Sequence, residues 1–110
     1  MKISLTNNFE KEAKQLSKKY HSLRTDLKNL LTELEENPFM GDALGQGCYK
    51  VRLRIASKNR GKSGGSRVIT YVQIVKETVY LLKIYDKSEQ STVSEDELTW
   101  LIEQAKKMED

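Results

Sequence analysis

The sequence predicts one α+β domain in which two N-terminal helices pack on a small, mainly antiparallel sheet, in the order βααβββα. Three observations support this prediction. The 110 residues suffice for a single compact domain. In the first third of the chain, apolar residues recur at intervals of three and four, as in amphipathic helices. From residue 49 onward they alternate with polar residues, as in half-buried strands, before helical spacing returns near the C-terminus.

The N-terminal part predicts a short strand at residues 2–5 and then two helices. Asn7 and Glu10 have the spacing of a capping box, which places the first helix at about residues 8–18. The second helix ends at Asn37, because a residue that precedes proline avoids helical geometry. Its apolar stripe consists of Leu16, Tyr20, Leu23, Leu27, Leu30, Leu31 and Leu34. A short connection near residues 17–19 predicts that the two helices form an antiparallel pair. Three glycines between residues 41 and 47 predict a loop.

The C-terminal part predicts three strands and a last helix. The strands cover about residues 49–55, 66–75 and 78–85, the last two being rich in β-branched residues. Ser94 and Glu97 form a capping box, and Val93 and Leu98 have the spacing of a hydrophobic staple, so a helix begins there.

The composition excludes several classes of protein. No apolar run approaches the roughly 18 residues of a membrane span, and the N-terminus lacks the apolar core of a secretory signal. Without such a run, we expect no membrane partner. A single cysteine, Cys48, allows no intrachain disulfide, which predicts a reducing cytoplasm. With one histidine and one cysteine, most zinc sites are excluded, and we expect neither a metal nor a cofactor.

Basic residues concentrate in the middle of the chain. Residues 48–87 carry ten basic and two acidic residues, a net charge of +8, although the whole chain carries only +3. Residues 48–67 hold seven cations and no carboxylate. Such a block is a candidate surface for a polyanion. The alternative is a solvated basic face, although such faces usually mix both signs.

Alternation along the strands predicts where these cations point. Lys50, Arg52 and Arg54 alternate with apolar residues and share one face. In the second strand of the sheet, Arg67 and Tyr71 lie opposite an apolar face formed by Val68, Val72 and Ile74. In the third, Lys83, Tyr85 and Lys87 lie opposite Tyr80, Leu82 and Ile84.

If these polar faces coincide, the sheet presents cations interleaved with Tyr71 and Tyr85, which suits RNA. Lysine and arginine contact phosphate, and aromatic rings stack on splayed bases. In the alternative, both tyrosines pack under the final helix. Lys58, Arg60 and Lys62 belong to a Gly/Ser-rich loop predicted to add phosphate contacts.

A resemblance to a known family rests on two stretches, CYKVRLRIASKNRGKSGGSRVITYVQIV and VYLLKIYDKSE. They are similar to the RelE/HigB group of bacterial toxins from type II toxin–antitoxin systems, and most of all to its HigB-like branch. The resemblance spans about residues 37–90. It implies a RelE-like fold and ribosome-dependent cleavage of mRNA. It also implies a cognate antitoxin, often of the helix-turn-helix DNA-binding type, so that operator DNA is contacted only through the antitoxin.

The resemblance also implies site residues. Lys50 and Arg52 match the lysine-rich strand of RelE-type enzymes, Arg67 matches the arginine that opens the next strand, and Lys87 matches a basic position after the third strand. The chain departs from the family there. Asp86-Lys87-Ser88-Glu89 replaces the usual Gly-Lys-Arg-Glu, and the tyrosine expected a few residues later is missing.

The implied reaction is metal-free attack of the ribose 2′-OH on its 3′-phosphate, which requires a base, an acid and cations around the phosphate. We expect Lys50 to be the base, because neighbouring cations disfavour its charged form. Arg52 and Arg67 would stabilise the phosphate, and Lys87 would be the acid or a further phosphate contact. Two alternatives stay open, namely a toxin that contacts a topoisomerase and a non-catalytic RNA- or ribosome-binding module.

Overall fold

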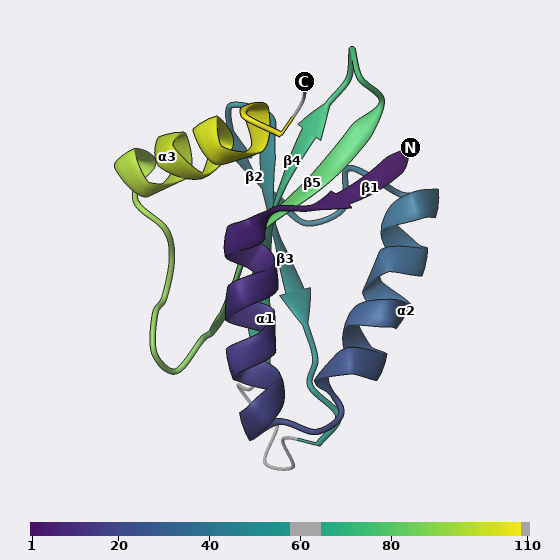
Figure 1. Cartoon of the computed structure of the whole chain (residues 1–110), viewed down its shortest axis with the longest axis vertical. Coiled ribbons are helices and arrows are strands. Elements are labelled where there is room, and N and C mark those ends of the chain that lie inside the picture. Colours follow the sequence, from purple (N-terminus) through teal and green to yellow (C-terminus); the bar gives the residue numbers. More distant parts are fainter. Residues whose placement is uncertain (58–64, 109–110) are drawn as a thin grey trace.

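The computed structural model describes residues 1–57 and 65–108. The predicted phosphate contacts Lys58, Arg60 and Lys62 lie outside these residues. The fold is the predicted α+β arrangement of helices on a mainly antiparallel sheet, with one strand more than predicted (Figure 1). In chain order the elements are β1 (Lys2–Leu5), α1 (Asn7–Lys19), α2 (Leu23–Glu36), β2 (Asp42–Gly45), β3 (Cys48–Leu53), β4 (Ser66–Gln73), β5 (Thr78–Asp86) and α3 (Glu95–Lys106).

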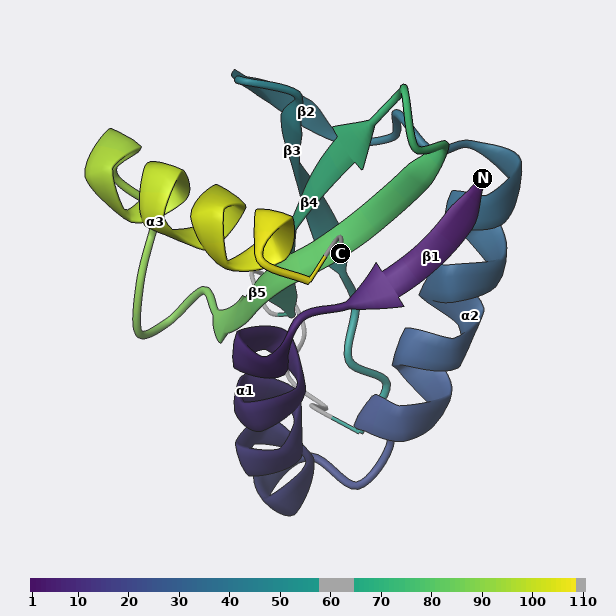
Figure 2. The same cartoon turned by 45° about the horizontal axis from the view of Figure 1, so that its top comes forward.

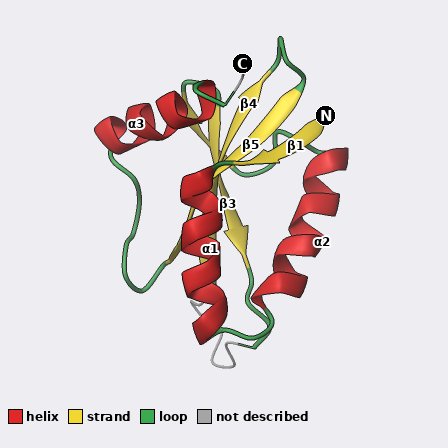
Figure 3. Cartoon of the chain, viewed as in Figure 1, coloured by secondary structure: helices red, strands yellow, loops and turns green. Residues whose placement is uncertain are grey.

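The five strands form one twisted sheet in the order β1-β5-β4-β3-β2 (Figure 3). β2, β3, β4 and β5 are linked by antiparallel pairings, and only β1 runs parallel to its neighbour β5. Figure 2 shows β1 beside β5 at this edge of the sheet. Among the described residues, no helix is long and apolar enough to cross a membrane.

The sheet has an apolar cluster on each face. Helices α1 and α2 cover one face, where Phe9 and Leu23 pack against strand residues such as Val51 and Val68. Helix α3 covers the other face, where Leu98 and Leu101 belong to the second cluster. Figure 1 shows α3 apart from α1 and α2. On this side of the sheet, α3 therefore covers part of the surface that β3, β4 and β5 share.

Both N-terminal helices form, but their ends differ from the prediction. The cap of α1 is Thr6 rather than Asn7, because the Thr6 Oγ1 accepts the Phe9 N–H at 3.1 Å. The joint between the helices lies at residues 20–22 rather than 17–19. Helix α2 ends with Asn37 as its C-cap, directly before proline, as predicted. The predicted cap of α3 is confirmed, since the Ser94 side chain accepts the Glu97 N–H at 3.1 Å.

The strands contain one element that the sequence analysis missed. β2 was predicted as loop because of its glycines, yet it pairs with β3 through a hairpin in which Gly45, Gln46 and Gly47 all have positive φ. The predicted strand at 66–75 ends at Gln73. Ile74 and Val75 then lie exposed in the turn to β5.

A bulge changes the predicted faces of β5. Ile69 pairs with Lys83 and Thr70 with Leu81, so Leu82 is the extra residue. Tyr80 and Leu82 consequently lie in the α3 cluster, whereas Ile84 lies in the opposite one. The prediction that these three residues share a face is wrong. Lys83 and Tyr85 do lie opposite Ile84, as predicted.

β1 pairs with β5 only as far as Leu81. From there on, the side chain of Thr6 and side chains of α1 form hydrogen bonds with the backbone along this edge of β5. Thr6 Oγ1 donates to the Leu81 carbonyl at 3.1 Å, and Asn8 Nδ2 donates to the Leu82 carbonyl at 3.0 Å. Glu12 Oε1 accepts the Ile84 N–H at 3.2 Å. Backbone groups at a sheet edge need partners, and α1 supplies them here. Helix α1 is thereby fixed against the part of β5 that carries Lys83 and Tyr85.

Candidate nucleic-acid interface

A row of polar side chains crosses the sheet on the α3 side. Arg52 of β3 lies directly opposite Arg67 of β4, and Arg67 lies opposite Tyr85 of β5. Directly opposed residues have Cβ atoms about 5 Å apart, and two like charges in that position destabilise the sheet. Within the described residues, neither arginine makes an ion pair. Two uncompensated guanidinium groups side by side are well suited to hold a phosphate.

The two arginines differ in exposure. Arg52 is exposed, whereas Arg67 is only 8% exposed and its Nη1 donates to the carbonyl of Ser66 at 3.2 Å. Arg67 is thus held in one place by its surroundings. The pair combines a buried cation with an exposed one.

Two further cations lie near the end of this row. Arg54 follows β3 and is exposed. A Cβ on Gly65 would lie 2.7 Å from the Leu53 carbonyl oxygen and 3.5 Å from the Cα of Arg54, so the chain before β4 passes close to Arg54. The backbone N–H of Lys87 donates a long hydrogen bond to the Gly65 carbonyl oxygen, with 3.5 Å between nitrogen and oxygen. Lys87 itself is exposed. Arg54 and Lys87 therefore flank the same end of the sheet.

Lys50 occupies the next position on the same face. It lies opposite Ile69, which in turn lies opposite Lys83. Lys50 is half-buried and, among the described residues, has no ion pair. The structure therefore brings Lys50, Arg52 and Arg67 onto one face of adjacent strands, as their alternation predicts.

Lys83 does not belong to an open surface, contrary to the prediction. It is 9% exposed, and its Nζ contacts Glu12 Oε2 of α1 at 2.8 Å and Glu97 Oε2 of α3 at 3.2 Å. Burial alone would lower the pKa of Lys83, but the hydrogen bonds and charges of Glu12 and Glu97 hold that pKa above its ordinary value. Lys83 therefore ties α3 to α1 across β5.

The two candidate stacking tyrosines are buried, at 7% exposed for Tyr71 and 6% for Tyr85. Tyr71 stacks on Tyr80 with ring centroids 5.9 Å apart and accepts a hydrogen bond from Gln73. Tyr85 packs in the α3 cluster, and its hydroxyl has no hydrogen-bond partner among the described residues. Burial raises the pKa of Tyr85, although the charges of Arg67 and Lys83 oppose this. The alternative interpretation, in which both tyrosines pack under the final helix, describes the structure.

The sequence analysis did not anticipate the contacts of three carboxylates. The carboxylate of Glu12 was not singled out, and Glu97 was recognised only as part of a capping box. Asp86, 1% exposed, accepts hydrogen bonds from the Tyr20 hydroxyl at 2.8 Å and from Ser88. These carboxylates contact residues of elements that are distant in sequence, so no local pattern in the sequence indicates the contacts.

Cys48 is buried, and the described residues hold no cluster of metal ligands. Burial raises the pKa of the Cys48 thiol to about 12, so the nucleophilic thiolate is scarce near neutral pH. Across residues 1–57 and 65–108, no three histidine, cysteine or carboxylate side chains gather in a way that could hold a metal ion.

A comparison with protein families identifies the chain. A model described as "RelE toxin of RelE / RelB toxin-antitoxin system" matches residues 1–110, which is the whole chain. The chain belongs to the RelE toxin family. The RelE-like fold that the sequence resemblance implied is thus confirmed.

Solved structures of Escherichia coli RelE share the fold. A double arginine-to-alanine mutant of RelE in the free state has 22% sequence identity and a TM-score of 0.60, over 82% of this chain and 86% of that one. The isolated RelE toxin has 23% identity and a TM-score of 0.60, over 93% and 96%. RelE in the intact RelBE toxin–antitoxin complex has 24% identity and a TM-score of 0.58, over 76% and 92%.

Proposed function

We propose that this RelE-family chain is a ribosome-dependent endoribonuclease that cleaves mRNA without a metal ion. The observation that carries the proposal is the pair Arg52–Arg67, which has no carboxylate partner among the described residues and lies at the centre of a cationic face. A like-charged cross-strand pair costs stability, and binding of an anion offsets that cost. The anion that fits both this pair and a toxin of this family is an RNA phosphate.

In the proposed reaction, the 2′ oxygen of a ribose attacks the adjacent phosphorus. The bond between phosphorus and the 5′ oxygen of the next nucleotide breaks, leaving a 2′,3′-cyclic phosphate and a 5′-hydroxyl. Lys50 accepts the proton of the 2′-OH, and Lys87 donates a proton to the departing 5′ oxygen or contacts the phosphate. Arg52 and Arg67 stabilise the negative charge that grows on the phosphate oxygens.

The unequal burial of Arg52 and Arg67 supports a different role for each of them in the reaction. A fixed donor stabilises a transition state without reorganising, which suits the buried Arg67. An exposed donor such as Arg52 can engage the substrate before the reaction. The segment after β5 lacks a second basic residue, since Ser88 follows Lys87. The ribosome is therefore proposed to supply part of the substrate alignment.

Two partners complete the proposal. E. coli RelE was crystallised in complex with its antitoxin, and we propose that an antitoxin neutralises this chain as well. It is expected to be of the DNA-binding type, so that operator DNA is reached only through it. The other partner is the translating ribosome with its mRNA.

The test is cleavage of a defined mRNA on purified translating ribosomes, read by primer extension. We expect discrete cuts with the parent chain and a loss of about 100-fold or more in rate for Arg52→Ala, typical of removing one oriented donor. Lys28→Ala, which removes an exposed cation of α2, is the matched control and should cleave normally. Ribosome binding without cleavage by the parent chain would favour the non-catalytic module instead.

A further inference from the structure

A buried carboxylate lies directly before Lys87, the residue to which the proposed reaction gives the role of acid or phosphate contact. Asp86 is the last residue of β5, and its burial leaves almost no surface for a substrate. Its Oδ1 accepts two hydrogen bonds from Ser88, one from the backbone N–H at 2.9 Å and one from the hydroxyl at 2.8 Å. Its carbonyl oxygen accepts the N–H groups of Glu89 and Gln90 at 2.9 and 3.2 Å. Asp86 therefore closes the turn that carries Lys87.

The second carboxylate oxygen of Asp86 connects this turn to the helices. Tyr20, the C-cap of α1, donates its hydroxyl to Asp86 Oδ2 at 2.8 Å. This hydrogen bond joins residues that are 66 positions apart in the sequence. Lys19 Nζ lies 4.0 Å from the same oxygen, but the Lys19 side chain is exposed, so this ion pair contributes little. One side chain thus holds the turn after β5 against the connection between α1 and α2.

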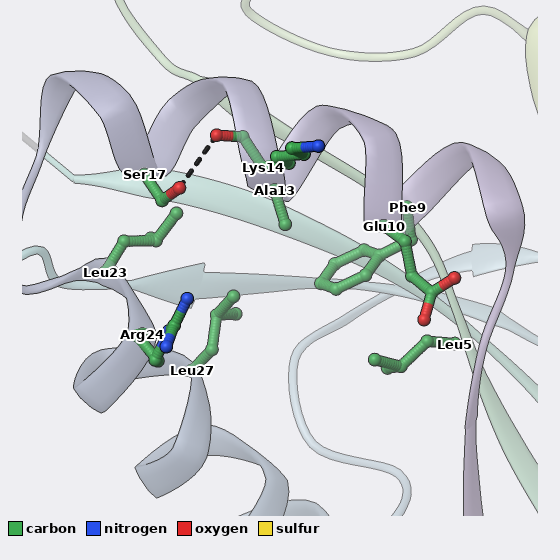
Figure 4. A pocket seen from close by; sticks show the side chains of 9 residues that line it. All are labelled: Leu5, Phe9, Glu10, Ala13, Lys14, Ser17, Leu23, Arg24 and Leu27. Atoms are coloured by element: carbon green, nitrogen blue, oxygen red, sulfur yellow. Dashed lines mark hydrogen bonds between the residues drawn. The ribbon is translucent and has the colours of Figure 1, made fainter.

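Tyr20 is held in place by the packing of the helices. Its side chain packs against the apolar cluster that α1 and α2 form with the sheet. Figure 4 shows the space between these helices, where Phe9 and Ala13 of α1 face Leu27 of α2. Packed side chains of a protein interior shift little, because the interior is dense. The Tyr20 hydroxyl is therefore a donor of fixed position for Asp86.

Strand pairing holds the backbone of Lys87 from the other side. Asp86 pairs with Ser66 in β4, and the Lys87 N–H donates to the Gly65 carbonyl. The residue after Ser66 is Arg67, so Lys87 begins where the cationic row ends. The Lys87 side chain is exposed, and a long exposed side chain samples many rotamers. A fixed backbone limits the positions that its ammonium group can reach.

The hydrogen-bonded residues Asp86 and Ser88 are also the two positions of this turn at which the chain departs from the usual Gly-Lys-Arg-Glu. Glycine has no side chain, so at the position of Asp86 it could accept none of the side-chain hydrogen bonds described above. The chain thus lacks the second cation of the pattern but has a turn that is held by a buried carboxylate.

We propose that Asp86 is a positioning residue of the reaction and that it holds the turn so that the Lys87 ammonium reaches the phosphate or the departing 5′ oxygen. The inference rests on the proposed function for the role of Lys87. Asp86 acts through its hydrogen bonds with Ser88 and Tyr20. Such placement matters because a shift of about 1 Å in a reacting group can cost about 100-fold in rate.

The experiment measures cleavage of mRNA on translating ribosomes at increasing concentrations of the full chain. Asp86→Ala should lower the rate at saturation by about 10- to 100-fold, and the half-saturating concentration should stay within about twofold, because Asp86 is buried. Asp86→Asn should keep the rate within about threefold, since its amide oxygen accepts from Ser88 and its NH₂ group donates to the Tyr20 oxygen. Tyr20→Phe, which removes one hydrogen bond, should lower the rate by a smaller factor than Asp86→Ala.

A double-mutant cycle with Lys87→Met tests whether Asp86 acts through Lys87. In the Lys87→Met background, Asp86→Ala should cost less than about twofold in rate, because the group that it positions is already absent. If Asp86→Ala does not fold, Tyr20→Phe takes its place in the cycle. Thr6→Ala, which removes a buried hydrogen bond to Leu81, is the control for lost stability and should cleave like the parent chain. Thermal melts of all variants set an assay temperature at which each is folded.

Equal losses from Asp86→Ala in the two backgrounds would overturn the positioning role and leave the nuclease proposal intact. A loss in Asp86→Asn as large as in Asp86→Ala would overturn it in the same way. If Lys87→Met cleaved at the parent rate, both the role of Lys87 and this inference would be wrong. A parent chain that binds ribosomes without cleaving mRNA would overturn the proposed function, and this inference with it.

Discussion

Arg67→Met separates the role of Arg67 in the reaction from its effect on stability. The side chain of Arg67 is 8% exposed, lies opposite Arg52, and has no carboxylate partner among the described residues. Methionine retains most of the aliphatic volume, whereas alanine would leave a cavity. Replacing a buried, uncompensated charge by an apolar side chain of similar size is often neutral or stabilising.

The structure allows the magnitude to be worked out. Like charges directly opposite each other cost on the order of 0.2–1 kcal/mol, so Arg67→Met should raise the melting temperature by about 1–5 °C. Cleavage should meanwhile fall by about 100- to 1,000-fold, which corresponds to about 2.7–4 kcal/mol of lost transition-state stabilisation. The variant is therefore expected to be a more stable protein and a much weaker enzyme.

A double-mutant cycle isolates the pair. Arg52→Met, Arg67→Met and the double variant are compared with the parent chain by urea unfolding. The coupling free energy should be repulsive, and the repulsion should decline as salt increases from about 0.05 to 0.5 M. Lys28→Met controls for the change in net charge, since Lys28 is exposed on α2. An attractive coupling, or a melting temperature of Arg67→Met several degrees below that of the parent, would refute the reasoning about uncompensated charge.

Three more predictions concern the scaffold. The raised pKa of Lys83 means that its ion pairs with Glu12 and Glu97 stabilise the fold below the unfolded-state lysine pKa of about 10.4, and that this stabilisation is lost as pH rises through the folded pKa. As the pH rises above about 10.4, the stability of the parent chain in thermal melts should therefore fall by more than that of Lys83→Met; parallel curves would contradict this. Cys48, with its pKa of about 12, should react with iodoacetamide at about pH 8 only after unfolding in urea, and rapid labelling of the native protein would disprove its burial. Thr6→Ala removes a helix cap and a buried hydrogen bond to Leu81, so the free energy of unfolding should fall by about 1–2 kcal/mol in urea titrations; an unchanged midpoint would show that another group caps α1.

Local patterns predicted much of the fold. Alternation along β3 and along β4 predicted that Arg52 and Arg67 each lie opposite the apolar face of their strand, because successive side chains of a strand point to opposite faces; the pairing of the two strands puts them on one face. Ser94 marked the start of α3 because its side chain caps the helix. The helix end at Asn37 followed from the geometry that proline imposes on its predecessor.

The errors arose where distant parts of the chain meet. The bulge at Leu82 moved Tyr80 and Leu82 to the α3 face, and no local signal in the sequence marks a bulge. Tyr85 and Lys83 looked exposed from alternation alone, but α3 covers this face and Glu97 pairs with Lys83. β2 was missed because its glycines also suit a loop.

The most direct test of the central claim is the chemistry of the RNA ends. Purified ribosomes translating a defined mRNA are mixed with the parent chain, and both fragments are analysed at the cut. Attack by the 2′-OH predicts a 2′,3′-cyclic phosphate on the upstream fragment and a 5′-hydroxyl on the downstream fragment, with the yield falling by about 100-fold or more for Arg52→Ala. A 5′-phosphate on the downstream fragment would indicate attack by water and contradict the proposed reaction.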